Sequence, residues 1–167
     1  MLKELAQLEA LVRQEIDAQK CLTAAVGRKL AAMRAADHRG VVACCQEENR
    51  LVQSAGDLAK ARMTLVAQLT QALDPAAAQP LRLGELAEKL GEPARGKLLL
   101  LRSQLRQEME TVRRQSGIAR SAAQVLAAHM RGLVQMVGSA MSGVGVYDRG
   151  GALPRTAAAI RTFQTTA

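Results

Sequence analysis

Histidine and cysteine are the side chains of this sequence that could bind a metal ion or act as nucleophiles. His38, Cys44 and Cys45 lie close together in the sequence. Adjacent cysteines on a helix point about 100° apart, so they cannot easily share a metal as a Cys-x-x-Cys pair can. His38 is on the same helix face as Cys45, but two donors do not complete a metal site. We therefore interpret Cys44 and Cys45 as small apolar packing residues and expect no metal.

The second histidine, His129, lies in the sequence Ala-His-Met-Arg-Gly, where an exposed imidazole could accept a phosphoryl group. In phosphotransfer helices a cation and a glycine usually follow at the third and fourth positions, whereas Arg131 and Gly132 follow here at the second and third. This spacing favours an ordinary surface histidine, and phosphotransfer is the one enzymatic alternative left open. The sequence has no Ser-His-acid arrangement, phosphate loop or paired-carboxylate motif, and Glu47 and Glu48 are interpreted as exposed or intra-bundle charges. We expect no catalytic residue and no cofactor.

The composition indicates which elements must carry these residues. Of the 167 residues, 49% are apolar, yet there is one Phe, one Tyr and no Trp. A core without aromatic residues has to be built from Leu, Val, Met and Ala at helical spacing. The sequence therefore predicts an all-α fold, an antiparallel bundle of three long helices and one short helix with coiled-coil-like packing.

Two long helices are predicted over residues 2–36 and 38–73, separated by Asp37 as the N-cap of the second. The stripe of the first helix, apolar except at Gln19, recurs every three or four residues, at Leu5, Leu8, Val12, Ile16, Gln19, Leu22, Val26, Leu30 and Met33. The second stripe is weaker because Glu48 and Arg62 interrupt it. Its apolar or small positions are Val41, Cys45, Leu51, Ala55, Leu58, Leu65, Leu69 and Leu73.

A short helix over 83–90, ended by Gly91, is expected to cap one end of the bundle. A third long helix follows Pro93, over 94–141, and exceeds the other two in length. Its seam comprises Leu98, Leu101, Leu105, Met109, Val112, Ser116, Ala119, Ala123, Leu126, Met130, Leu133 and Val137. Residues 1–141 are thus predicted to form the bundle, and 142–167, rich in Gly and Thr, a flexible tail.

Positive charge is concentrated in the C-terminal part of the chain. Residues 1–94 hold 12 Lys or Arg against 12 Asp or Glu, whereas residues 95–167 hold 11 against 3. On the long third helix, one side carries six arginines: Arg95, Arg102, Arg106, Arg113, Arg120 and Arg131. This stripe could bind an acidic partner, or it could pair with acids of the first two helices. Nucleic acid is not expected, because zinc-finger spacing, an aromatic ladder and a Lys/Arg block are all missing.

The C-terminal end of the same helix is the predicted protein-binding site. Its apolar positions are expected to stay exposed, and the tail that follows holds both aromatic residues of the chain, Tyr147 and Phe163. Together they form a surface that needs a partner helix. The predicted substrate-binding residues are Leu126, Met130, Leu133, Val137, Met141 and Tyr147.

The order of these parts resembles the FlgN family of flagellar type III export chaperones. The resemblance includes the Leu-periodic first helix, the turn at Asp37, the very long last helix and the junction Tyr147-Asp148 with Gly150 or Gly151. It implies a chaperone that binds hook-associated proteins of the FlgK and FlgL type, prevents their early assembly and escorts them to the export apparatus. In such proteins the C-terminal part engages a helical segment of the substrate.

Three further expectations concern location and assembly. An odd number of cysteines, three, and an N-terminus without a secretory pattern indicate a cytoplasmic protein. No apolar run approaches the ~20 residues of a membrane-spanning helix, so membrane insertion is not expected. The alternative to a chaperone is a structural coiled-coil adaptor that self-associates, which would be a homodimer.

Overall fold

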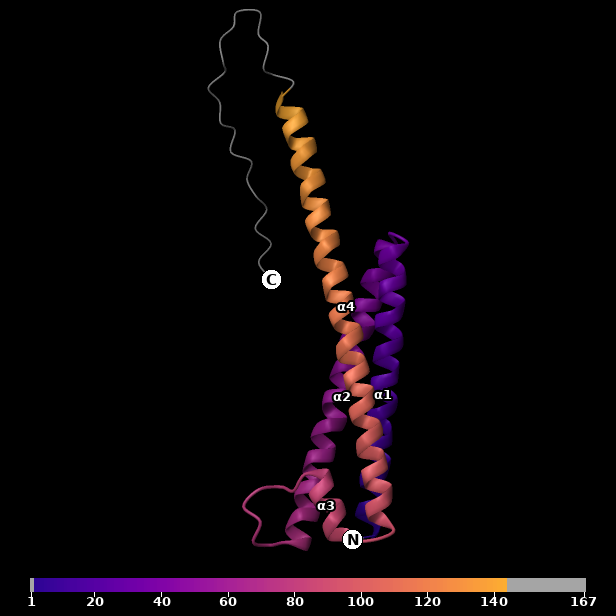
Figure 1. The fold of residues 1–167 in the computed structure, drawn as a ribbon, viewed down its shortest axis with the longest axis vertical. Coiled ribbons are helices and arrows are strands. Elements are labelled where there is room, and N and C mark those ends of the chain that lie inside the picture. The colour runs from indigo at the N-terminus through magenta and orange to yellow at the C-terminus, as the bar shows by residue number, and fades with distance from the viewer. Residues whose placement is uncertain (1, 144–167) are drawn as a thin grey trace, which may run out of the picture. The chain divides into compact units, whose positions relative to one another are not determined.

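The computed structural model describes the backbone of residues 2–143 and the side chains of residues 2–140. Four helices follow one another: α1 (Leu2–Arg34), α2 (His38–Leu73), α3 (Leu83–Leu90) and α4 (Ala94–Gly143) (Figure 1). The described part of the chain contains no strand. The predicted all-α class is therefore confirmed, and the predicted helix bounds differ from the observed ones only at two ends.

The turn between α1 and α2 shows why the first helix ends before residue 36. Ala36 has a left-handed φ of 54°, which an α-helix cannot continue through. Asp37 then caps α2 as predicted, because its Oδ1 accepts a hydrogen bond from the backbone N–H of Gly40 at 3.0 Å. The short turn makes α1 and α2 antiparallel neighbours (Figure 1).

The chain divides into two compact units, and the division falls inside α4, between Gln124 and Val125. The core of the first unit is almost entirely aliphatic and draws on all four helices. Its buried members are Leu8, Val12, Ile16, Leu65, Val66, Leu69, Leu86, Ala87, Leu98, Leu101 and Leu105. Those of α1 and of the first turns of α4 belong to the predicted stripes, as do Leu65 and Leu69 of α2, whereas Val66 was not predicted.

The two residues that interrupt the stripe of α2 bind to α1. Glu48 forms an ion pair with Lys29, and Arg62 donates from Nε to Oε1 of Glu15 at 2.8 Å. One oxygen of Glu48, Oε1, is buried and accepts no hydrogen bond. The interruptions are therefore contact positions between the two helices.

A third, more exposed pair joins the same helices beside the pair of Lys29 and Glu48. Arg28 and Glu47 approach to 2.7 Å, with about half of each side chain exposed. The hydrogen bond and the charge of Glu47 raise the pKa of Arg28. Glu47 and Glu48 thus both pair with cations of α1, the intra-bundle alternative of the sequence analysis.

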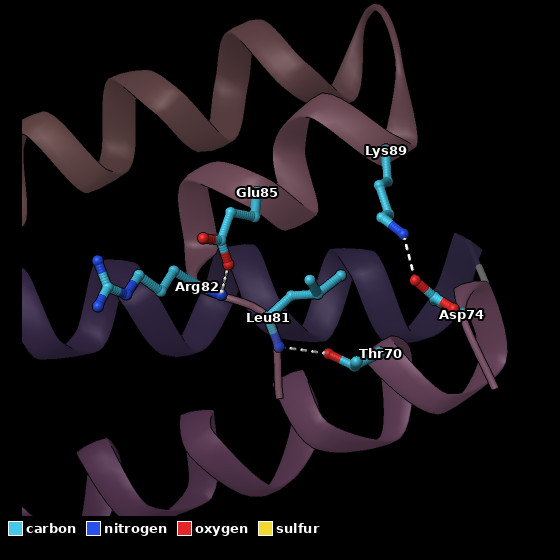
Figure 2. A network of polar contacts seen from close by, with 6 residues as sticks. All are labelled: Thr70, Asp74, Leu81, Arg82, Glu85 and Lys89. Carbon is cyan, nitrogen blue, oxygen red and sulfur yellow. Dashed lines mark hydrogen bonds and ion pairs between the residues drawn. The ribbon is translucent and has the colours of Figure 1, made fainter. Parts of the chain in front are cut away.

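Polar contacts fasten the connection between α2 and α3 (Figure 2). The hydroxyl of buried Thr70 donates to the carbonyl of Val66 and accepts from the backbone N–H of Leu81 at 3.0 Å. The backbone N–H of Arg82 donates to Glu85, which closes the first turn of α3. These bonds hold the connection against the end of α2.

Lys89 of α3 reaches Asp74, the residue that ends α2 (Figure 2). The hydrogen bond from Lys89, reinforced by its charge, lowers the pKa of Asp74. Leu86 and Ala87 of α3 are fully buried, and Gly91, with φ +70°, ends the helix. As predicted, α3 closes one end of the core.

Candidate functional site

The second compact unit begins at Val125 and contains the C-terminal part of α4. Four residues of the predicted binding site lie there on one side of the helix, at spacings of four, three and four residues. All are exposed large hydrophobic residues: Leu126 (47%), Met130 (53%), Leu133 (41%) and Val137 (59%). We call these four residues the apolar stripe. Met141 and Tyr147, the other two predicted residues, lie outside the described side chains.

Three more hydrophobic residues, missed as site residues by the sequence analysis, widen this surface. Val125, Val134 and Met136 are even more exposed than the apolar stripe. Each adjoins a stripe residue in the sequence and points roughly 70–110° away from the stripe around the helix. The apolar doublets at 125–126, 133–134 and 136–137 were the signal that could have revealed them.

Burial along α4 changes before the unit boundary. Leu98, Leu101 and Leu105 are buried, and the last buried side chain is Ala119. None of the described side chains from Val125 onward is buried. Met109, predicted in the seam, is exposed, so the seam is covered over fewer turns than its periodicity indicates.

The arginines of α4 do not pair with acids of α1 or α2 within the described residues. Arg95 bonds to Glu88 of α3 at 3.0 Å, and Arg106 bonds to Glu110 of its own helix at 2.9 Å. The alternative in which this stripe pairs with acids of the first two helices is therefore not observed among the described residues. The remaining stripe residues are exposed and have no ion pair to a described acid: Arg102, Arg113, Arg120 and Arg131.

Two adjoining hollows lie in the first unit and share Arg102. One, of about 360 Å³, is lined by Arg62, Met63, Val66, Pro80, Leu81, Arg82, Leu83 and Arg102. The other, of about 450 Å³, is lined by Arg102, Leu105, Arg106, Met109, Glu110 and Arg113. We call the two hollows together the arginine groove.

The cysteines and histidines do not assemble a site in the described chain. His38, Cys45 and His129 are exposed, and Cys44 is half-buried. The interpretation of Cys45 as a packing residue is wrong, because its side chain is exposed. Among residues 2–143, no cluster of three or more His, Cys, Asp or Glu could hold a metal ion.

Within the described chain, none of the four helices is apolar over a length that could cross a membrane. Comparison with known proteins identifies no relative: no protein-family model, curated protein or solved structure matches this chain.

Proposed function

We propose that the chain is a non-catalytic chaperone that holds an amphipathic helix of a client protein against the C-terminal part of α4. The observation that carries this proposal is the apolar stripe, in which four large side chains are about half exposed. Soluble proteins rarely leave contiguous apolar surface uncovered unless it binds something. A helical client would cover this one.

The spacing of the stripe determines the kind of client. Side chains repeating every three or four residues along three turns fit the complementary stripe of another helix. Met130, in the middle, has a flexible, polarizable side chain that can repack against different ligands. The flanking Val125, Val134 and Met136 would enlarge the contact when the client helix is long or bulky.

The resemblance to flagellar export chaperones supplies the proposed identity of the client. It would be the terminal helical segment of a hook-associated protein of the FlgK or FlgL type, kept from early assembly in the cytoplasm and delivered to the export apparatus. The segment after Gly143, with Tyr147, would close over the bound helix. In this proposal the segment becomes ordered only on binding, which would cost conformational entropy and keep the complex releasable.

The test is size-exclusion chromatography with light scattering on the full chain, alone and mixed with terminal helical segments of FlgK-like and FlgL-like proteins. A stoichiometric complex supports the proposal. A stable, concentration-dependent dimer that takes up neither segment would identify a self-associating coiled-coil adaptor instead. Truncation after Gly143 should leave the helices folded and weaken the complex, and unchanged binding would contradict the role of the tail.

A matched pair of variants tests the stripe itself. Leu126→Ser with Leu133→Ser removes two stripe residues, and Val125→Ser with Met136→Ser removes two exposed hydrophobic residues beside the stripe. The minority of interface residues that cost more than about 1 kcal/mol each when truncated cluster near the centre of a contact. We expect the first pair to weaken client binding about tenfold or more and the second pair about threefold or less. Equal losses would show that the stripe is not the contact.

A further inference from the structure

The arginine groove lies entirely within the first compact unit and uses none of the apolar stripe. Its first hollow combines the C-terminal half of α2, the connection before α3 and the first turns of α4. Its second hollow continues along α4 from Arg102 to Arg113. This is an elongated surface, running for about three turns of α4.

The floor of the arginine groove is apolar. Val66 and Leu105 are buried members of the core whose edges reach the groove, and Leu83 is half-buried. Met63 and Met109 are exposed and have no apolar cover within the described chain. Two exposed methionines above an aliphatic floor are suited to receive apolar side chains of a ligand.

The rim is positively charged. Arg62 and Arg106 are neutralised by Glu15 and Glu110, respectively. Arg82, Arg102 and Arg113, in contrast, have no ion pair to an acid of the described residues. These three guanidinium groups are exposed and available to carboxylates.

The position of Arg102 explains why it joins the two hollows. A Cβ added to Gly84 of α3 would lie 3.7 Å from the guanidinium carbon of Arg102. The Arg102 side chain therefore extends over the first turn of α3 and stands between the hollows. Arg82 precedes that same turn, and its side chain is directed away from the pair of Asp74 and Lys89 (Figure 2).

We propose that the arginine groove binds an acidic amphipathic helix of a second partner protein. Its apolar face would lie on Met63, Leu105 and Met109, and its flanking carboxylates would meet Arg82, Arg102 and Arg113. Helix-in-groove recognition needs this combination of an elongated apolar floor and complementary charge at the rim. The inference stands apart from the proposed client site, because the two surfaces share no residue.

Charge selects this occupant over the alternatives. Residues 144–167 of the chain hold three arginines and one aspartate, so the chain's own C-terminal segment has the wrong sign. A second copy carries a net charge of +8 and is repelled as a whole. Nucleic acid would meet the arginines, but the floor offers it no aromatic side chain for base stacking.

The experiment is selection of displayed helices on the immobilised full-length protein. The library consists of helices about five turns long with a fixed stripe of leucines. Each position that flanks the leucine stripe is varied between Glu and Lys. We expect Glu to be enriched over Lys in the selected helices. A selected helix is then made as a labelled peptide and its affinity is measured by fluorescence anisotropy. No enrichment of Glu would overturn the proposal.

Charge-reversal variants locate the binding. Arg102→Glu with Arg113→Glu should weaken binding of the selected peptide about tenfold, since each reversal turns an attraction at the rim into a repulsion. Lys97→Glu with Arg114→Glu is the control, because it makes the same change of charge on α4 outside the groove, and it should weaken binding about twofold or less. Equal losses of affinity in the two double variants would overturn the proposal. So would binding of a labelled single-stranded oligonucleotide that is weakened by the Arg102 and Arg113 reversals when binding of the peptide is not. Far-ultraviolet circular dichroism confirms that each variant is folded.

Discussion

The carboxylate of Glu15 in α1 accepts a hydrogen bond from Nε of Arg62 in α2 at 2.8 Å, with only 4% of Glu15 exposed. A charge that is so fully removed from water depends on its partner, because desolvation costs several kcal/mol per ion. Arg62 keeps about a quarter of its side chain exposed. Arg62 is therefore more exposed to water than Glu15, and Glu15 is the partner whose charge would be destabilising without the ion pair.

Arg62→Met leaves the Glu15 carboxylate buried without its partner. We expect the free energy of unfolding to fall by about 3 kcal/mol, measured by urea denaturation followed by circular dichroism. The double variant with Glu15→Met should regain most of this loss, because apolar side chains can replace a buried ion pair. A double variant no more stable than Arg62→Met would contradict this account. Lys60→Met is the control, because its pair with Asp57 is exposed and worth about 0.5 kcal/mol or less.

Thr70→Val removes the hydroxyl that joins α2 to the connection before α3. Thr70 is only 2% exposed, so the N–H of Leu81 loses its acceptor in a place with little access to water. We expect a loss of about 1–2 kcal/mol in the free energy of unfolding, and faster hydrogen exchange at the Leu81 amide. Thr70→Ser should retain the bond. Thr64→Val is the control, because the Thr64 hydroxyl is exposed and bonds only within its own helix. If Thr64→Val accelerated hydrogen exchange at the Leu81 amide as much as Thr70→Val does, the bond from Leu81 to Thr70 would not be the cause.

The pair of Asp74 and Lys89 should make stability depend on pH in the acidic range. The pKa of Asp74 is lowered in the folded protein from its ordinary value of 3.8, so the folded state favours the ionised carboxylate. The contribution of the Asp74–Lys89 pair to the free energy of unfolding is therefore complete above about pH 5. It is lost as the pH falls through 3.8 toward the lower pKa of Asp74 in the folded protein. The stability difference between the wild type and Asp74→Asn should shrink over this window in urea titrations. A difference that is constant or grows on acidification would contradict the prediction.

Leu86→Ala tests whether α3 is part of the core. Leu86 is fully buried between the long helices, so its truncation leaves a cavity and should cost about 3 kcal/mol. Leu100→Ala is the matched control, since Leu100 is exposed on α4 and Leu and Ala have similar helix propensities. We expect the control to change the free energy of unfolding by about 0.5 kcal/mol or less. If both variants unfolded at the same urea concentration, α3 would not be part of the cooperative core.

The helices were predictable because their signals are local. The stripe of α1, the cap at Asp37 and the stop at Gly91 each depend on a few neighbouring residues. The end of α1 was placed two residues too late, because the left-handed conformation of Ala36 has no signature in a run of alanines and polar residues. Met109 was placed in the seam for a related reason, since periodicity indicates a face of a helix but not how far that face is covered.

The contacts between helices were less predictable. Glu48 and Arg62 interrupt an otherwise apolar stripe in the sequence, and only the pairing of α2 with α1 brings them to Lys29 and Glu15. The arginine groove could not be predicted from the sequence for the same reason. The arginine stripe of α4 was visible, but Met63 and Arg82 join it from segments distant in the sequence.

The two least exposed ion pairs between α1 and α2 have opposite polarity: α1 supplies the acid at Glu15 and the base at Lys29. The two residues of α1 are as far apart in the sequence as their partners on α2. Sliding one helix along the other by a single turn would therefore separate both pairs at once and leave the carboxylates of Glu15 and Glu48 without their cations. An aliphatic seam alone would tolerate such a slip, because one leucine fits much as the next does. The charges thus give the hairpin a single register.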